Sequence, residues 1–472
     1  MRRYGLLVSL LVLVCGVASA QNSDIEALSG VQFDFGNPGA RAMGMGGAFL
    51  GLADDASAAE ANPAGLTILR SPEISLEVRH FLMQQNLPVT GTVPDIMTEP
   101  FKEWSRTAEI QFASIVFPMG NWAIAGYYHH PVNYENAGAV LPEFDAVGSV
   151  TRPLPNFFFN AGNPVGSVGA ISKDECFRRE EETGDLCFEG TMFPFVTAVE
   201  IDLKTMGLSL AWESGPLSLG ATARYQRLKE AAFTTRADPV FFQPTSVLVQ
   251  STFNDDFEPD WEDDITFAAG FKWVLRDGLS IGGVYKQGPE FPAPVFLGVA
   301  GQEDFTEFAD VSFNVPDAYG IGLSWRPLPV LTLNADAIEV KYSSLSDNVI
   351  ATTTYTTGAD FQAEDALELR FGGEYFFITR IPVAIRAGYW QEPGHSLEYV
   401  GPNTCADAAV PENERINCVA QRTVAGILFP ESEDLDHYSI GIGLAWPSFQ
   451  IDAAYDTSDK FKVGSITAVY RF

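Results

Sequence analysis

The sequence predicts an all-β protein: a 14-stranded antiparallel transmembrane β-barrel with an N-terminal hatch, or plug, segment in its lumen. Three observations support this fold class. Apolar and polar residues alternate along many short segments, short and long connections take turns between these segments, and the chain begins with an export signal. Period-two alternation is typical of barrel strands, because only every second side chain meets lipid.

Residues 1–20 are expected to be a signal peptide. A basic start (Arg2-Arg3) precedes a mainly apolar stretch at 5–16, and Ala18-Ser19-Ala20 offers small residues for cleavage. The alternative interpretation is a transmembrane anchor, but the apolar stretch is short for a membrane helix and polar residues follow it at once. The sequence therefore predicts an exported chain that starts at Gln21.

Residues 21–71 are expected to form the hatch, because they match no strand pattern. They are rich in Gly and Ala and contain the turn Asn62-Pro63-Ala64. Small residues allow close backbone packing, and a barrel of about 14 strands is too wide to be filled by its own side chains. A disordered periplasmic tail is the alternative, but the segment carries apolar residues such as Phe33 and Phe35.

Residues 72–472 are expected to form the barrel. The C-terminus illustrates the pattern: Ile466, Ala468, Tyr470 and Phe472 alternate with mostly polar residues, whereas a helix would need apolar residues at i, i+3 and i+4. The even number of strands is that of bacterial barrels. The predicted strands are 72–83, 108–118, 121–130, 195–213, 216–229, 264–275, 278–288, 316–325, 329–342, 365–377, 382–392, 436–446, 447–457 and 463–472.

The lengths of the connections separate a membrane barrel from a soluble β-sandwich, which also shows alternation. Every second connection is very short, as at Met119-Gly120 and Ser214-Gly215, whereas most of the others are long, notably 131–194, 230–263 and 393–435. Short periplasmic turns and long extracellular loops are the arrangement of outer-membrane barrels. The sequence therefore predicts a bacterial outer-membrane protein, with the short turns in the periplasm and the long loops outside the cell.

The negative charge follows the long connections. The net charge is −32, or −34 without residues 1–20, and the six predicted outer connections carry −27 of it. Such a charge excludes nucleic acid, which requires a basic surface. The acids solubilise exposed loops or, alternatively, bridge divalent cations to lipopolysaccharide through the acidic run at 255–264. That run lacks the ligand order of an EF-hand, so neither a metal site nor a cofactor is predicted.

Four cysteines remain after the signal peptide. Cys176 and Cys187 fall in one predicted loop, and Cys405 and Cys418 fall in another. In an oxidising compartment we expect disulfides within each loop, each contributing roughly 3 kcal/mol if unstrained. A metal site is the weaker alternative, because there is no CxxC motif.

No catalytic group is predicted, and the protein is not expected to be an enzyme. Ser280 lies in a G-x-S-x-G match, but this motif needs a strand-to-helix elbow and here it opens an alternating strand. His129 and His130 are adjacent on a strand, so they are expected to face opposite sides.

Several segments resemble the FadL/TodX family of outer-membrane transporters for long-chain fatty acids and hydrocarbons. The resemblance lies in the hatch and in the late strands; the matching residues are Gly39-Ala40-Arg41-Ala42, Gly44, Gly46, Gly47, Ala53-Asp54-Asp55-Ala56, Asn62-Pro63-Ala64-Gly65-Leu66, Val315-Pro316-Asp317, 368–375, 385–389 and Tyr470-Arg471-Phe472. The resemblance implies that Arg41, Asp54, Asp55, Asn62, Pro63 and Ala64 belong to the hatch motif.

The resemblance implies passive uptake of long-chain fatty acids or other hydrophobic small molecules. Ligand would enter from outside, occupy a lumen pocket and leave sideways into lipid. Phe33, Phe35 and the loop residues Phe157, Phe158 and Phe159 are the candidate ligand contacts, although the three loop phenylalanines could equally pack on the rim. Expected partners are the hydrophobic ligand and outer-membrane lipid or lipopolysaccharide, with the chain a monomer. The alternative is a non-transporting barrel that serves as scaffold or shuttle for secreted proteins.

Overall fold

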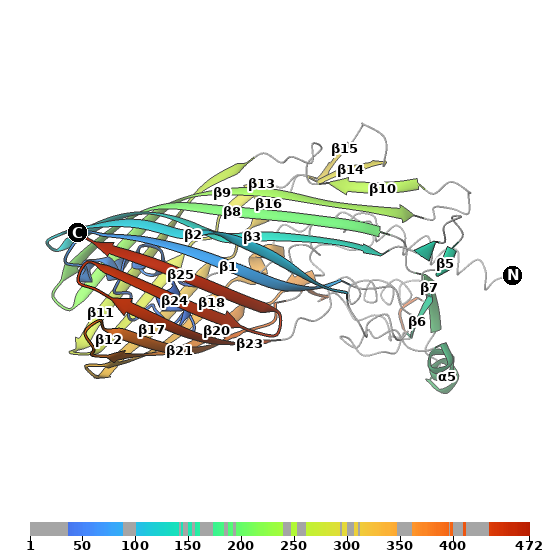
Figure 1. Ribbon diagram of the computed structural model, residues 1–472. Helices are drawn as coiled ribbons and strands as arrows, with labels where there is room; N and C mark the ends of the chain where they lie inside the picture. Colours follow the sequence, from blue (N-terminus) through green and yellow to red (C-terminus); the bar gives the residue numbers. More distant parts are fainter. Residues whose placement is uncertain are drawn as a thin grey trace.

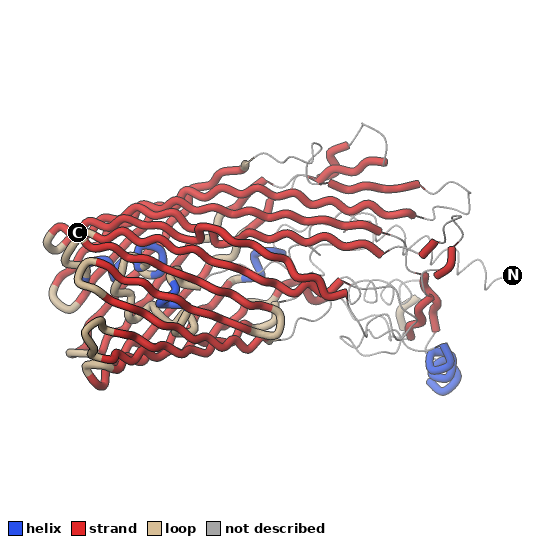
Figure 2. The backbone as a smooth tube through the Cα atoms, in the orientation of Figure 1, coloured by secondary structure: helices blue, strands red, loops and turns tan. Residues whose placement is uncertain are grey.

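The computed structural model is a single closed β-barrel that carries a small array of strands and one helix beyond its outer end (Figures 1 and 2). It describes residues 36–87, 101–140, 143–144, 150–152, 156–160, 173–183, 187–191, 195–238, 247–252, 261–292, 295–299, 306–309, 312–346, 361–395, 397–399, 409–411 and 434–472. Within these ranges no helix combines the length and the apolar character needed to span a bilayer.

Fourteen antiparallel strands form the barrel, and each of the fourteen predicted ranges overlaps one of them. The last strand pairs with the first, with Glu73 opposite Arg471, which closes the ring within one chain. The strands are β1 (Glu73–Leu87), β2 (Phe101–Met119), β3 (Trp122–Val140), β8 (Phe195–Ser214), β9 (Leu217–Asp238), β11 (Glu262–Arg276), β12 (Leu279–Lys286), β17 (Ala318–Leu328), β18 (Leu331–Val340), β20 (Ala366–Phe377), β21 (Val383–Glu392), β23 (Leu435–Ala445), β24 (Phe449–Thr457) and β25 (Phe461–Arg471).

Side chains alternate between lipid and lumen as the sequence pattern predicts. On β8, Leu208 and Leu210 are exposed outside, whereas Thr205 and Ser209 are buried inside. Exposed aromatic residues flank this apolar belt near both ends, which is the girdle arrangement of outer-membrane barrels. They include Trp122, Trp212, Trp273 and Trp325 at one end, and Tyr225, Tyr319, Tyr438 and Tyr455 at the other.

The two ends of the barrel differ as predicted. Short turns join β2 to β3, β8 to β9 and β11 to β12, and each contains a glycine with positive φ: Gly120 (66°), Gly215 (59°) and Gly278 (75°). These turns and the C-terminus lie at the same end (Figure 1). A side chain rarely adopts such a φ, which explains glycine in these tight turns.

The strands β2, β3 and β9 continue well beyond their predicted outer limits. β3 ends at Val140 rather than 130, and β9 ends at Asp238 rather than 229. The regular alternation of apolar and polar residues that defined the predicted strands is lost there, although backbone pairing with β8 continues. The predicted loops 131–194 and 230–263 are therefore partly strand.

Shorter elements lie at the outer end. The sheet continues from β9 through β10 to β14 and β15, and four two-stranded sheets are paired β4–β5, β6–β7, β13–β16 and β19–β22. Their bounds are β4 (Glu143–Phe144), β5 (Val150–Arg152), β6 (Asn156–Asn160), α5 (Lys173–Thr183), β7 (Cys187–Thr191), β10 (Val247–Thr252), β13 (Glu290–Pro292), β14 (Val295–Val299), β15 (Thr306–Ala309), β16 (Ser312–Asn314), η4 (Tyr342–Ser346), β19 (Phe361–Ala363) and β22 (Leu397–Tyr399).

Residues 36–71, here called the lumen segment, lie inside the barrel (Figure 1). The segment contains α3 (Ala40–Met43), α4 (Ala58–Ala61) and η1 (Pro63–Ile68), and most of its residues are buried. Its apolar side chains, such as Met45, Phe49 and Leu66, belong to one buried cluster with Phe112 and other wall residues. Close packing depends on small residues on both sides: a Cβ on Gly220 of β9 would come within 3.0 Å of Pro63 and Ala64.

Candidate functional site

The lumen segment is attached to the wall by buried charges, and Arg41 of α3 is central to the first cluster. Its guanidinium donates to Asp54 at 2.5 Å, to Glu374 of β20 at 2.9 and 3.0 Å, and to Asp55 at 3.3 Å. Burial disfavours the charge, yet the carboxylates of Asp54 and Glu374 raise the pKa of Arg41 well above its usual value. Arg41, Asp54 and Asp55, which the family resemblance assigned to one motif, are therefore in direct contact.

A second cluster surrounds Glu60 of α4. Its carboxylate accepts hydrogen bonds from the Tyr127 hydroxyl of β3 and from Lys286 of β12 at 3.0 Å, with Arg224 of β9 at 3.5 Å. Burial opposes ionisation, but Lys286 and Arg224 lower the pKa of Glu60 to about 2. His129 of β3 lies 3.9 Å away. One carboxylate thus joins the lumen segment to three wall strands.

Uncharged backbone groups of the lumen segment also bind the wall. Asp336 of β18 accepts from the amides of Phe49 and Leu50 at 2.6 and 2.8 Å. Asn62 donates to the carbonyls of Leu50 and Phe271 at 3.1 and 3.0 Å and accepts from the Ala64 amide at 3.2 Å. The Asn62-Pro63-Ala64 turn is therefore fixed between the lumen segment and β11.

Ser280 is one more attachment point of this kind. It lies on β12 in the G-x-S-x-G match, and its hydroxyl donates to the carbonyl of Gly51 at 2.8 Å. The strand context is the one expected from the sequence, and the hydroxyl is occupied in holding the lumen segment.

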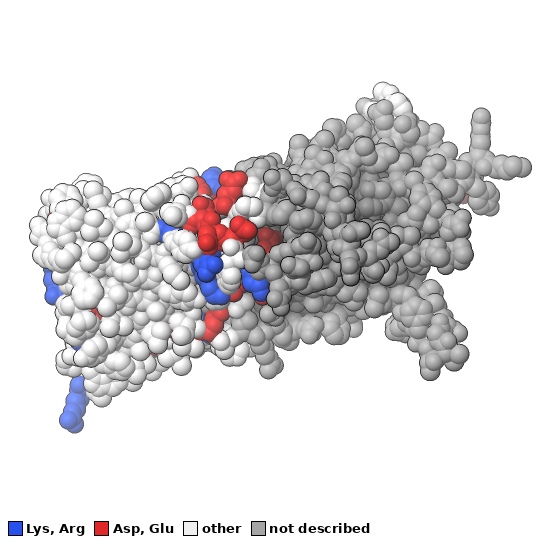
Figure 3. Space-filling view, turned by 90° about the horizontal axis from the view of Figure 1, so that it is seen from above, with Lys and Arg blue, Asp and Glu red and all other residues white. Residues whose placement is uncertain are grey.

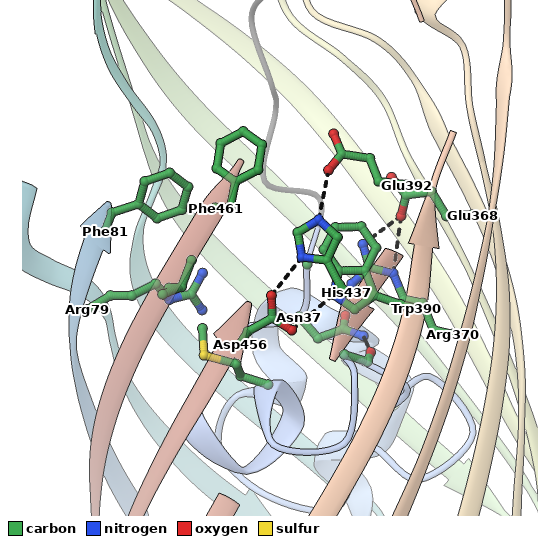
Figure 4. Close-up of a pocket in the computed structure, with 14 residues that line it drawn as sticks. Asn37, Arg79, Phe81, Glu368, Arg370, Trp390, Glu392, His437, Asp456 and Phe461 are labelled. Atoms are coloured by element: carbon green, nitrogen blue, oxygen red, sulfur yellow. Dashed lines mark hydrogen bonds and ion pairs between the residues drawn. The ribbon is translucent and has the colours of Figure 1, made fainter. Parts of the chain in front are cut away.

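A pocket lies between α3 and the strands β1, β20, β21, β23, β24 and β25 (Figure 4). Phe81 and Phe461 face each other on one side with ring centroids 5.8 Å apart. On the other side the Trp390 ring stacks on His437 at 3.9 Å and carries the Arg370 guanidinium 4.4 Å from its centroid. Gly36, Asn37, Met43 and Gly47 of the lumen segment complete the lining, with Arg79, Glu368, Glu392, Asp456 and Val463 from the wall.

The charged groups of this pocket are bound to one another. Arg370 donates to Glu368 at 2.5 Å, and the His437 imidazole lies between Asp456 at 2.7 Å and Glu392 at 3.2 Å. Arg79, at the side of Phe81, donates to Glu77 at 2.9 Å. The lining thus combines flat aromatic surfaces with cations that already have carboxylate partners.

The seam between β2 and β3 is the irregular part of the wall. Their ladder runs from Met119 opposite Trp122 only as far as Phe112 opposite His129. Beyond that point β2 remains paired with β1 up to Phe101, and β3 with β8 up to Val140. The two strands therefore continue outward without pairing to each other.

Two bulges mark the point where the ladder stops. The register shifts between Ile110 and Phe112 on β2 and between His129 and Val132 on β3. Pro131 lies in the second bulge, and proline has no N–H to give to a ladder. Bulges re-aim side chains and end pairing, which is why both His129 and His130 are buried here.

Four polar side chains span the unpaired seam, and we name them the seam clasp: Glu109, Gln111, His130 and Asn133. Glu109 accepts from Asn133 at 2.9 Å and lies 2.8 Å from the His130 imidazole, and Gln111 donates to the His130 carbonyl. The other imidazole nitrogen of His130 lies 2.6 Å from Asp202 of β8. Side chains thus replace the missing backbone hydrogen bonds.

The seam and the lumen segment meet on the inner face of β3. Tyr127, which donates to Glu60, stacks on Phe112 at 5.9 Å between ring centroids, and the Phe112 and His129 rings lie 6.1 Å apart. These aromatic residues lie where the β2–β3 ladder ends. Sequence reasoning did not identify Glu60, the pocket or the seam clasp, although Pro131 within a predicted loop next to a strand was a visible signal.

Other predicted site residues fall in parts that carry no side-chain description. Phe33, Phe35, Cys405 and Cys418 lie outside the described residues. Phe157, Phe158 and Phe159 lie on β6, Cys176 on α5 and Cys187 on β7, with only their backbone described. Among the described residues, no group of three or more His, Cys, Asp or Glu could hold a metal ion.

Comparison with known proteins identifies the fold. No protein-family model matches the sequence, and no curated protein matches it. Solved structures that are similar to nearly the whole chain include the following three. A Pseudomonas aeruginosa FadL homologue has TM-score 0.57 at 15% identity and covers 94% of this chain and 100% of its own.

The second structure is the CymD monoaromatic hydrocarbon channel, with TM-score 0.55, 13% identity and coverage of 93% of this chain and 99% of its own. The third is the Pseudomonas putida toluene transporter TodX, with TM-score 0.53, 11% identity and coverage of 93% and 99%. At such identities the likeness establishes a shared FadL/TodX-type barrel fold.

Proposed function

We propose that this chain is an outer-membrane channel for passive uptake of hydrophobic small molecules, which leave the lumen sideways through the β2–β3 seam. The observation that carries the proposal is the ladder that stops at Phe112 and His129 while both strands continue. A closed ladder offers no lateral path, whereas a seam held by side chains can open without breaking backbone hydrogen bonds between β2 and β3. Two of the similar structures are described as a monoaromatic hydrocarbon channel and a toluene transporter, which agrees with transport rather than catalysis.

The lumen segment supports a sideways route. It contacts wall strands on all sides of the barrel, and its buried ion clusters hold it there. We therefore propose that it acts as the hatch, blocking passage along the barrel axis. An apolar ligand gains about 0.8 kcal/mol per buried CH₂ in the pocket, so capture requires no energy source.

The pocket supports an uncharged, flat substrate rather than a fatty acid. Its lining has three carboxylates against two guanidiniums and one imidazole, and both guanidiniums and the imidazole already have carboxylate partners. A fatty-acid carboxylate would have to displace a bound acid and then lie beside the remaining ones. Trp390 and His437, whose rings stack on each other, and Phe81 and Phe461, whose rings are tilted, offer aromatic contacts for a substrate ring. A monoaromatic hydrocarbon is the proposed ligand class.

Three further assignments accompany this proposal: a monomer, removal of the signal peptide and two disulfides. The ring closes within one chain, so we expect a monomer that needs no strand from a second copy. We also propose that residues 1–20 are removed on export, and that Cys176–Cys187 and Cys405–Cys418 are disulfides.

Uptake assays in cells that carry only this channel test the proposal. Trp390→Ala should slow uptake of radiolabelled toluene roughly fivefold by removing an aromatic contact. Trp325→Ala is the matched control, because Trp325 is an exposed residue of the lipid-facing girdle. If Trp390→Ala left toluene uptake normal but slowed palmitate uptake, the proposed ligand class would be overturned. If a deletion strain took up toluene and palmitate normally but accumulated secreted proteins in its periplasm, the shuttle function would be favoured instead.

A further inference from the structure

The outward face of β8, β9 and β11 changes from apolar to charged within one row of residues. Met206, Tyr225 and Ile265 form one row across the three strands, and Met206 and Ile265 are 51% and 62% exposed. The next outward row is Lys204, Arg227 and Asp263, again in register. Because outward positions are two residues apart, the charges begin roughly 7 Å above the last apolar side chains.

A further row adds a third cation and an aromatic ring. Lys229 lies opposite Asp202, and Trp261 precedes β11. The Lys204 ammonium lies 4.3 Å and the Arg227 guanidinium 5.2 Å from the Trp261 ring centroid. We call Lys204, Arg227, Lys229 and Trp261 the basic patch. Acidic and basic side chains form such a band beside an uncharged wall surface in Figure 3.

Each cation of the basic patch has one carboxylate partner and remains accessible. Lys204 pairs with Asp202 at 2.5 Å, Arg227 with Asp263 at 2.7 Å and Lys229 with Glu200 at 3.6 Å. The three cationic side chains are 29%, 38% and 28% exposed. Since an ammonium has three donors and a guanidinium five, each keeps donors for an outside ligand.

The same height on the opposite side of the barrel is different. Tyr389 and Tyr438 form a row on β21 and β23, and the outward positions above them are Gln391, Asp436 and Asp434. None of these described positions carries Lys or Arg. The basic patch is therefore a cluster of three cations that β21 and β23 lack, and a single cation, Lys341, follows the outer end of β18.

We propose that the basic patch binds the phosphate groups of the phosphorylated saccharolipid in the outer leaflet. The cations lie just above the apolar belt, which is the level of lipid headgroups, and Trp261 is the residue type that favours this interface. Phosphate is the acceptor that Lys and Arg recognise best at this position. The paired acids hold the cations in place across three strands. The patch also adjoins the seam, because Asp202 contacts both Lys204 and His130.

Lipid binding to the purified full-length barrel in detergent tests this inference. The probe is a bisphosphorylated, hexa-acylated lipid A, titrated by native mass spectrometry beside its dephosphorylated form. The triple variant Lys204→Gln/Arg227→Gln/Lys229→Gln should bind the bisphosphorylated probe about 100-fold more weakly, and each single variant roughly fivefold more weakly. Lys341→Gln is the control, because Lys341 is an equally exposed cation on another strand pair.

Three results would overturn the inference: equal binding by the triple variant, equal binding of the dephosphorylated lipid, or loss of binding on chelation of divalent cations. The last result would assign the lipid to the acidic side chains through bridging metal. The single variants keep two of the three ion pairs, so they test the patch even if the triple variant does not fold. Lipid binding is measured without substrate, so its failure is distinguishable from a failure of the uptake function.

Discussion

Side chains, rather than a backbone ladder, hold two parts of this barrel: the lumen segment and the seam between β2 and β3. The two sets of side chains differ. The lumen segment is held by deeply buried charges; the side chains of Arg41 and Glu374 are 11% and 0% exposed. The seam clasp is partly solvated: its imidazole, His130, is 5% exposed, but the carboxylates of Glu109 and its neighbour Asp202 are 21% and 17% exposed. Removing a partner from a buried ion pair costs far more than losing a partly solvated hydrogen bond. The seam is therefore the part expected to move.

Removal of Arg41 should have the largest effect in this comparison. Arg41→Ala leaves the carboxylates of Asp54, Asp55 and Glu374 buried without their shared cation. We expect a loss of about 3–5 kcal/mol in the free energy of unfolding, measured by urea titration of the refolded barrel in lipid vesicles. Lys341→Ala removes an exposed cation with two carboxylate partners, at 2.5 and 2.9 Å, and should cost at most about 1 kcal/mol. Equal losses in the two variants would show that burial does not separate the two kinds of pair.

The second-largest effect is expected from acid, which should weaken the attachment of the lumen segment at Glu60. The pKa of Glu60 falls from 4.5 to about 2 in the folded barrel, because Lys286 and Arg224 outweigh the effect of burial. A lowered carboxyl pKa stabilises the fold fully above pH 4.5, and this stabilisation disappears as the pH falls towards 2. We expect wild type to lose up to about 3 kcal/mol across that interval.

Glu60→Gln tests the assignment of this pH dependence. The variant should be less stable than wild type at pH 7, since Lys286 and Arg224 lose their carboxylate. Its unfolding free energy should then change less between pH 4.5 and 2 than that of wild type. The same slope in both proteins would remove Glu60 as the cause.

The difference between the two regions also explains what the sequence could predict. Alternation and loop lengths were sufficient for all fourteen strands, because lipid on one side and a lumen on the other act on every residue of a strand. Resemblance to a known family grouped Arg41 with Asp54 and Asp55. Glu374 lies in the matching segment 368–375, but nothing in the sequence joined it to this cluster from 333 positions away, because only the closure of the barrel brings it there.

The pocket and the seam were harder to predict for the same reason. Trp390 and His437 stack because they lie opposite each other in the register that pairs β21 with β23. The connection between these strands is long, so the sequence alone does not determine this register. At the seam, the sequence His129-His130-Pro131 does contain the cause of the irregularity. Its consequence depends on a second bulge at Gln111, and two independent bulges at one height are visible only in three dimensions.

Cross-linking the seam is the most direct way to sharpen the comparison, although its expected effect is the smallest. Glu109→Cys/Asn133→Cys replaces two clasp residues whose side chains are 2.9 Å apart, and a short bifunctional maleimide would then join β2 to β3. Substrate release into the lipid of proteoliposomes should slow roughly tenfold, about 1.4 kcal/mol in the barrier. The effect is limited because the linker restrains two positions and leaves the rest of the seam without a ladder.

The matched control places the same cross-link where the ladder is intact. Ile115 and Gly126 lie opposite each other on β2 and β3, and a Cβ on Gly126 meets no atom within 4 Å. Ile115→Cys/Gly126→Cys, joined by the same maleimide, adds a restraint where backbone hydrogen bonds already hold the strands together, so release should be unchanged. If both cross-links slowed release alike, the effect would come from general stiffening of the wall. If neither did, substrate would leave by another route, and the lumen segment would become the part that moves.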